Sequence, residues 1–443
     1  MSRKIKCIAV ALLAPLVMCG GMAGAQPAVY MGTQRVESRM IEVAVPEFLV
    51  SGEDPEGWGA QSARIINFDL GVSGYFKVME NYDFLRQATQ RDMASGQIMF
   101  EEWRTLASNF LVKGVITREA QGRLTLEARV YDLQTKKLFF AKRYTGPSPL
   151  FRRIAHQFSD DFLNRFTGEQ GMARTRIAFV SRVEGRKELF ISDYDGADAR
   201  QVTQDRSIVL FPHINPKNPG LLLFTTFRYR NPDLYALRLS DNTRYPLSRR
   251  VGSNAVGEWS PDGTKVAFSL SREGDSDIYT VNADGTEPKR LTFERSIETS
   301  PAWSPDGQSI AFTSDRSGSP QVYTMRADGS ETKRLSFKGS WNDGSSWSPK
   351  GNQIAFTSLL GAVFDIAVVN PADPSSLRNL TNSVGSNEYP SWSPEGRHIA
   401  FASTRAGGVK QLFIIRADGG GEARKVTNLA GGADHPSWGP SPE

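Results

Sequence analysis

Carboxylate and amide side chains recur at a fixed distance before a repeated tryptophan. With the residues beside them, they are Asn254, Ala255, Glu298, Thr299, Asn342, Asp343, Asn387, Glu388, Asp434 and His435. Gathered around one opening, such groups could attract a cationic segment or a metal ion, although short polar residues also simply favour turns. Asp343 and Glu388 could alternatively act as the acid and base of an enzyme that cleaves a polymer.

Other motifs of catalysis or metal binding are missing from the sequence. The four histidines are scattered, and neither a His-Glu-x-x-His motif nor a Gly-x-Ser-x-Gly elbow occurs. Asp193-Tyr194-Asp195-Gly196 begins like a calcium loop but lacks the later glutamate. Because the matching positions of other repeats read Asn-Ala-Asp-Gly or Arg-Ala-Asp-Gly, we predict a hairpin turn there. We therefore expect no catalytic residue, no metal site and no cofactor.

A repeat of 44 or 45 residues must position these side chains. Trp-Ser-Pro-Asp-Gly, or a close variant, begins at Trp259, Trp303, Trp347 and Trp392. An apolar segment of the Ile-Ala-Phe type follows at the same period, centred on Phe179, Phe224, Phe268, Phe312, Phe356 and Phe401. Repeats of this length cannot bury an apolar face alone and must stack on their neighbours. The pattern predicts a β-propeller of six four-stranded blades.

The two ends of the repeat region indicate how the ring closes. The first repeat begins directly at its Ile-Ala-Phe segment, and the last residues, 434–440, supply the tryptophan phrase that it lacks. We expect this C-terminal strand to pair into the first blade, because an open edge would otherwise stay unpaired. In the second repeat, Phe211-Pro212-His213-Ile214 replaces the tryptophan phrase, so its position is inferred from the 45-residue step alone.

The residues before the repeats predict a small α/β domain over 26–168. A strand ends at Pro46, and a buried strand covers 111–116. Apolar and polar residues then alternate over 124–130, as expected for one strand of a hairpin covered on one side. Trp103, Leu106, Ala107 and Phe110 are spaced as one face of a helix. Ser148 is expected to cap a second helix with an apolar stripe of Leu150, Ile154, Phe158, Phe162 and Phe166. The fold class is therefore two-domain, with an α/β domain before a six-bladed all-β propeller (172–443) closed by the C-terminal strand.

The first 25 residues predict an export signal. Arg3, Lys4 and Lys6 precede an apolar run, and Ala23-Gly24-Ala25 suits a signal peptidase, so the mature chain is expected to begin at Gln26. The run is too short to span a bilayer, and Cys19 within a lipobox-like sequence leaves lipidation as an alternative. Both cysteines lie in this segment, which fits an oxidising compartment. Without the three basic residues the net charge falls from +5 to +2 and no basic stripe remains, so nucleic acid is not an expected partner.

An export signal, the α/β domain, the phrase Thr-Arg-Ile-Ala-Phe-Val-Ser, Ser-Asp-Tyr-Asp-Gly and the Trp-Ser-Pro-Asp-Gly repeats occur in that order. This order resembles the TolB family, the periplasmic component of the Tol-Pal system of Gram-negative bacteria. The resemblance implies a non-enzymatic, monomeric periplasmic scaffold that does not insert into the membrane. Such a scaffold binds the lipoprotein Pal at the channel mouth and TolA through its mature N-terminus, and supports outer-membrane integrity and invagination during the cell cycle at cell division.

Carried over by position, the Pal contact falls on the ten residues named at the outset. The TolA contact falls on the N-terminal strip, at Gln26, Pro27, Val29, Tyr30, Met31 and Val36. Replacing Glu298 and Glu388 by alanine is expected to weaken Pal binding while leaving the melting temperature nearly unchanged. The alternatives are a periplasmic propeller hydrolase or lyase acting on a polymer, and a lectin-like sugar binder.

Overall fold

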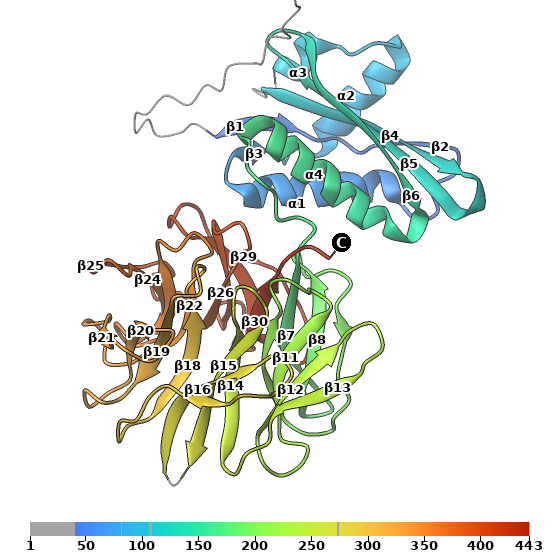
Figure 1. Cartoon of the computed structure of the whole chain (residues 1–443). Coiled ribbons are helices and arrows are strands. Elements are labelled where there is room, and N and C mark those ends of the chain that lie inside the picture. The colour runs from blue at the N-terminus through green and yellow to red at the C-terminus, as the bar shows by residue number, and fades with distance from the viewer. Residues whose placement is uncertain (1–39, 81, 106–108, 273, 443) are drawn as a thin grey trace, which may run out of the picture. The chain divides into compact units, whose positions relative to one another are not determined.

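The N-terminal part of the chain forms a mixed β-sheet with helices on both faces (Figure 1). The computed structural model describes residues 40–442 apart from 81, 106–108 and 273. The sheet order is β3-β1-β4-β5-β6, and β2 also pairs with β4. Its strands are β1 Ile41–Ala44, β2 Leu49–Ser51, β3 Phe76–Val78, β4 Phe110–Glu119, β5 Arg123–Asp132 and β6 Lys137–Pro147. Pro46, which has no N–H to donate, lies where β1 ends and before β2 resumes the pairing with β4.

Helix α4 packs one apolar face into the core of this domain. The helices are α1 Trp58–Ser73, α2 Tyr82–Ser95, α3 Phe100–Arg104 and α4 Phe151–Thr167, with 3-10 turns at Ala120–Gly122 and Ser148–Leu150. Ile154, Phe158 and Phe162 recur every four residues along α4, and all three are buried. They form one apolar face, which packs with residues of α1 and the sheet, as the spacing predicted.

Two local helix predictions were wrong. The predicted helix through Phe110 ends at Arg104, and Phe110 is the first residue of β4, because strand pairing with β5 and contacts with Phe139 and Phe166 outweigh the helical spacing. Leu106 and Ala107 lie outside the described residues. Ser148 makes no side-chain cap for α4, and Leu150 is exposed, since a 3-10 turn precedes the helix.

The remainder of the chain forms six four-stranded antiparallel sheets, the predicted blades. The first strand of each blade is called here its inner strand, and neighbouring inner strands contact one another in a closed ring. The strands are β7 Arg176–Val183, β8 Arg186–Asp193, β9 Arg200–Gln201, β10 Val209–Ile214, β11 Leu221–Thr226, β12 Asp233–Arg238, β13 Arg244–Ser248, β14 Ser253–Trp259, β15 Lys265–Arg272, β16 Asp275–Asn282, β17 Lys289–Arg290, β18 Glu298–Trp303, β19 Ser309–Ser314, β20 Gln321–Arg326, β21 Lys333–Arg334, β22 Asn342–Trp347, β23 Ile354–Ser358, β24 Asp365–Asn370, β25 Asp373–Asn379, β26 Asn387–Trp392, β27 His398–Ser403, β28 Gln411–Arg416, β29 Arg424–Lys425 and β30 Asp434–Gly439.

Each blade is built around the phenylalanine of its second strand. All six are fully buried, at Phe179, Phe224, Phe268, Phe312, Phe356 and Phe401. In the third blade Phe268 lies opposite Tyr279 of the next strand, with ring centres 6.0 Å apart. The preceding turn is held by Asp262, which accepts hydrogen bonds from the Ser260 hydroxyl and the Thr264 N–H. Each repeat therefore specifies both the buried phenylalanine and the turn that positions its strand.

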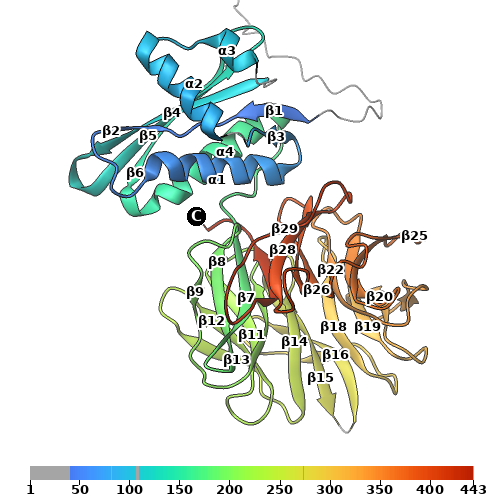
Figure 2. The same cartoon turned by 180° about the vertical axis from the view of Figure 1, so that it is seen from behind.

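The ring closes as predicted through the last strand, β30, which pairs with β7 of the first blade (Figure 1). Figure 2 shows the same ring from behind. Trp438 of β30 is 7% exposed, stacks on Tyr194, and donates a hydrogen bond from its indole N–H to Thr175, 2.7 Å away. The inner-strand edge of the first blade is thus supplied by residues more than 250 positions away in sequence. Chain ends that hold each other in this way leave no open blade edge.

The loops of the propeller fall into two sets at opposite ends of the strands. Because each blade is an antiparallel meander, loops that lead into inner strands share one end with loops that join second and third strands. We call these the rim loops. The turns at the other end contact the α/β domain, for example through the His398 ring, whose Nε2 lies 2.9 Å from the Val72 carbonyl of α1, and through Tyr194. Residues 40–443 form one compact unit.

Ring closure predicts a large difference between two tryptophan substitutions. Trp438→Ala removes a buried side chain and its hydrogen bond, and we expect it to lower the free energy of unfolding by about 3–5 kcal/mol. Trp341→Ala, at a rim-loop position that is 44% exposed, should change it by about 0.5 kcal/mol or less. Denaturant titration of both variants measures the contrast. Equal losses of unfolding free energy in the two variants would show that Trp438 of the closing strand contributes no more to stability than an exposed rim-loop tryptophan.

Candidate functional site

Every inner strand carries a β-bulge at the same place. The register shifts lie between Leu210 and His213, Ala255 and Glu258, Thr299 and Ala302, Asp343 and Ser346, Glu388 and Ser391, and Asp434 and Ser437. The second repeat thus follows the others, with Leu210 at the position inferred from its 45-residue step. A bulge re-aims the strand, so all six inner strands bend at the mouth of the channel.

Backbone strain coincides with these bulges. In each inner strand one bulge residue has a positive φ, and only Gly344 among the six is a glycine: Phe211 (52°), Val256 (49°), Ser300 (52°), Gly344 (65°), Tyr389 (57°) and His435 (50°). Side chains disfavour this conformation, and a branched residue such as Val256 disfavours it most. Each strained residue costs on the order of 1–3 kcal/mol, and such strain clusters at functional sites. The channel mouth is therefore the first candidate site.

Four of the predicted rim residues turn inward and anchor the rim loops. Asn254, Glu298, Asn342 and Asn387 are all fully buried. The Asn342 Oδ1 accepts a hydrogen bond from the Ser358 hydroxyl at 2.6 Å, while its Nδ2 donates to the Lys338 carbonyl at 2.9 Å. Asn387 is held in the same way by Ser403 and by the carbonyl of Gly385. These side chains hold the loops in place and present no surface to a partner.

Five other members of the predicted set are partly exposed at the mouth: Ala255, Thr299, Asp343, Glu388 and Asp434. The carboxylates do not stand free, because the Lys410 ammonium lies 2.8 Å from Glu388 and 3.8 Å from Asp434. Asp343 accepts a hydrogen bond from the Ser300 hydroxyl at 2.9 Å. Burial alone would raise the pKa of Asp434, but the His435 ring and Lys410 outweigh it and lower that pKa to about 2. Glu388 and Asp434 therefore share one ammonium, while Asp343 has a hydroxyl partner and no cation beside it.

The tenth member of the set, His435, joins an aromatic group at the mouth. Its ring stacks on Tyr389 with centres 3.9 Å apart and meets Phe211 edge-on at 4.7 Å. These residues are the positive-φ residues of β26, β30 and β10, three consecutive inner strands. The bulged backbone thus places three aromatic rings in contact on one side of the mouth, and we call this group the aromatic sector.

Deeper in the channel, side chains link one blade to the next. Glu258 accepts a hydrogen bond from the backbone N–H of Trp303, and His213 accepts one from that of Trp259. Desolvation raises the pKa of Glu258 and lowers that of His213, which favours the neutral form of each. Both side chains keep 20–29% of their surface, so channel water moderates the two shifts. Their spacing in the sequence carried no signal for this role.

The rim loops also carry the exposed apolar surface of the propeller. All nine large hydrophobic side chains that are exposed in its described part lie on these loops: Ile208, Tyr229, Val251, Phe293, Ile297, Phe337, Trp341, Val384 and Val409. Two of them are covered on one side by a guanidinium, with Arg290 over Phe293 at 4.8 Å and Arg334 over Phe337 at 5.1 Å. Concentrated exposed apolar surface marks a site of protein contact. Repeat alignment could have found Phe293 and Phe337, which occupy matching positions.

Basic charge accompanies this apolar surface. Among the described residues of the rim loops, the exposed charged side chains are Arg206, Arg228, Arg230, Arg249, Arg295 and Lys338, against Glu184 and Glu294. Such a balance favours a partner surface that is acidic around an apolar centre. The net charge of the whole chain is close to neutral, so composition did not predict this local excess of exposed basic side chains.

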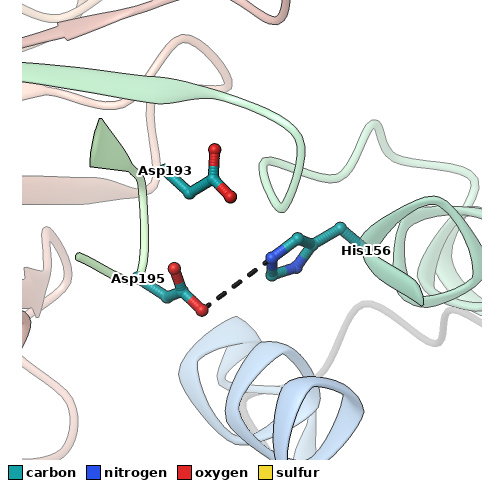
Figure 3. Close-up of side chains that lie close together, drawn as sticks. All are labelled: His156, Asp193 and Asp195. Carbon is teal, nitrogen blue, oxygen red and sulfur yellow. Dashed lines mark ion pairs between the residues drawn. The ribbon is translucent and has the colours of Figure 1, made fainter. Parts of the chain in front are cut away.

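A second cluster lies at the other end of the strands. Figure 3 shows His156 of α4 directed toward Asp193 and Asp195, which end β8 and form the following turn. The ligand atoms of these three residues lie within 4.8 Å of one another, a spacing that could hold a metal ion. The Arg152 guanidinium already occupies this position as a cation, with Nη2 bonded to Asp195 and 3.4 Å from the His156 Nε2. We therefore assign no metal here.

The Asp-Tyr-Asp-Gly turn at 193–196 is a hairpin turn, with the Gly196 N–H bonded to the Asp193 carbonyl. Taken separately, this turn and a lone histidine gave no sequence signal of a cluster. The clue was the departure of the first repeat from the Asn-Ala-Asp-Gly and Arg-Ala-Asp-Gly turns of later repeats.

Known families match both parts of the chain. The profile of the TolB beta propeller domain covers residues 163–442, and that of the TolB amino-terminal domain covers residues 33–139. The chain belongs to the TolB family. The crystal structure of TolB from Acinetobacter baumannii superposes with a TM-score of 0.76 at 26% identity, over 91% of this chain and 97% of that one.

Relatives within the TolB family carry the name Tol-Pal system protein TolB. The one from Desulfosudis oleivorans is 34% identical over 254 residues, 57% of this chain and 57% of that protein. The one from Anaeromyxobacter dehalogenans is 35% identical over 298 residues, 67% of each. The matched stretch thus spans 57–67% of the length of these relatives.

Both relatives are named as components of the Tol-Pal system, which supports a non-enzymatic role for this chain. Asp343 and Glu388, the acid and base of the rival hydrolase hypothesis, are held by Ser300 and Lys410. Over the described ranges, no helix is both long enough and apolar enough to cross a bilayer.

Burial of Glu298 overturns one expectation about substitutions at the rim. Its Oε1 accepts hydrogen bonds from Ser314 and Arg316, so Glu298→Ala leaves the Arg316 charge without its partner. We expect this variant to lose about 3–5 kcal/mol of unfolding free energy, whereas Thr299→Ala next to it should lose about 0.5 kcal/mol or less. Thermal and denaturant unfolding test the contrast. A Glu298→Ala variant as stable as the parent would return this side chain to the set available for binding.

Proposed function

We propose that this protein is a periplasmic scaffold of the Tol-Pal system that binds Pal with the rim loops and TolA with its mature N-terminus. In this role it supports outer-membrane integrity and invagination during cell division. The observation that carries the proposal is the placement of the propeller's exposed apolar side chains on the rim loops alone, within the part of the chain described.

The rim loops have the properties of a protein-docking surface. Phe293, Phe337 and Trp341 are aromatic side chains of the kind that dominate binding energy, and all three are 44–70% exposed. Arginines stack on two of them, which limits the side-chain entropy lost on binding. Buried amides anchor the loops, so the surface is held ready before a partner arrives.

The ten predicted residues divide between two roles in this proposal. Ala255, Thr299, Asp343, Glu388 and Asp434 are the members with surface to offer Pal. Asn254, Glu298, Asn342 and Asn387 position the loops from within, and His435 braces the aromatic sector. The apolar residues of the rim loops extend the contact outward from the mouth.

The TolA contact and the compartment rest on the sequence. Gln26, Pro27, Val29, Tyr30, Met31 and Val36 lie outside the described residues, as does the export signal over 1–25. The signal's basic residues, apolar run and small cleavage residues support periplasmic location. Relatives named for the Tol-Pal system support the choice of partners.

Removal of two rim aromatics tests Pal binding. Phe293→Ser with Phe337→Ser should weaken the affinity for Pal about tenfold or more without lowering the melting temperature, because both side chains are exposed. Isothermal titration with purified Pal measures the effect. Tyr82→Ser, an equally exposed aromatic of α2 in the α/β domain, is the matched control and should bind normally. Normal binding by the double variant would refute the rim-loop proposal.

Deletion of residues 26–36 tests the second contact. It should abolish binding of TolA and also change the affinity for Pal, because linked binding events must influence each other reciprocally. Titration of each partner onto the full mature chain and the deletion variant gives the comparison. Unchanged affinity for both partners would rule out a role for the strip.

A further inference from the structure

We propose that His156, with Asp69, Arg152, Asp193 and Asp195, forms a pH-sensitive latch between the α/β domain and the first blade. The latch is tight when the imidazole carries a second proton and loosens when that proton leaves. This role is independent of Pal and TolA binding and concerns how the two parts of the chain are held together.

The latch is buried and crosses between the two folds. His156 of α4 is 1% exposed, and its Nδ1 lies 2.9 Å from the Asp69 carboxylate of α1. The hydroxyl of Tyr194, which follows β8, donates to the same carboxylate at 2.6 Å. Because a carboxylate only accepts, the Nδ1 of His156 must be the protonated nitrogen.

The other side of the ring faces the first blade. Its Nε2 lies 3.8 Å from the Asp195 carboxylate and 3.4 Å from the Arg152 Nη2. A proton on Nε2 adds attraction to Asp195 against repulsion from the Arg152 guanidinium. Without that proton, Nε2 accepts a hydrogen bond from Arg152 and the attraction to Asp195 is lost. The second protonation therefore acts directly on the contact between α4 and the blade.

Charge balance explains why the proton matters. The charged and titratable groups around the ring are Asp69 from α1, Arg152 and Asp160 from α4, Arg176 from β7, and Asp193, Tyr194, Asp195 and Asp198 from the end of β8 and its turn. Asp160 is paired with Arg174. Within the latch, three carboxylates face two cations when His156 is charged and one when it is neutral. Buried charge without a partner is costly.

The pKa shifts agree in direction with this balance. Burial disfavours the charged imidazole, but Asp69 and then Asp195 outweigh burial, so the pKa of His156 is raised. A raised folded-state pKa stabilises the contact fully below the unfolded histidine pKa of about 6.5. That stabilisation is lost as the pH rises through the higher pKa of the folded state. The latch should therefore loosen as the pH rises above the pKa of an unfolded histidine.

Hydrogen exchange of the full mature chain tests the latch. We measure peptides from α1 and α4 at pH 6 and pH 9, corrected for the intrinsic exchange rate. Protection should fall about tenfold for each unit by which folding raises the pKa of His156, while peptides from the fourth blade should keep theirs. His156→Gln should remove the pH dependence. His213→Gln, a channel histidine away from the latch, should retain it.

Two results would overturn the latch. One is equal protection of α1 and α4 at both pH values in the parent chain, and the other is a parental pH profile in His156→Gln. Should His156→Gln fail to fold, Asp195→Asn serves instead. It removes one of the carboxylates that raise the pKa, so the loss of protection should move to lower pH. An unmoved midpoint in Asp195→Asn would equally reject the proposal.

Discussion

Closure of the ring by β30 is the constraint on which the rest of the structure depends. A single blade has one strand edge at the channel and two apolar faces, and it cannot bury both faces without a neighbour on each side. Pairing of β30 with β7 gives the first blade its inner strand and the last blade its neighbour. Trp438 secures that strand through Tyr194 and Thr175, so the two ends of the repeat region hold each other.

The closed ring stabilises a channel mouth whose backbone is strained but rigid. Six bulges with positive φ, five of them at residues with side chains, are tolerated because paired strands and buried amides such as Asn342 and Asn387 fix the chain on both sides. The strain bends every inner strand in the same way and brings Tyr389, His435 and Phe211 together. Apolar and basic side chains on the rim loops then surround a mouth where Lys410 is shared by the Glu388 and Asp434 carboxylates.

The closing strand also connects the two candidate sites, the channel mouth and the His156 cluster. Its first residues, Asp434 and His435, lie at the mouth, and Trp438 near its end stacks on Tyr194, whose hydroxyl reaches Asp69 of the α/β domain. Six residues thus contact both the rim and the junction. The mouth and the His156 cluster therefore lie at opposite ends of one continuous strand system.

The sequence by itself determined the number of blades, their closure, the α/β domain and the family, because turns and apolar strands recur with a period that only a closed ring can bury. It also located the channel mouth. Tertiary structure alone decided which mouth residues are buried: Asn254, Glu298, Asn342 and Asn387 share their sequence context with exposed neighbours, yet all four are fully buried and hydrogen-bonded. The end of α3 at Arg104 and the start of α4 at Phe151 were set by packing that no local pattern records. The cluster at His156 unites α1, α4 and β8, whose proximity follows from the fold rather than from spacing along the chain.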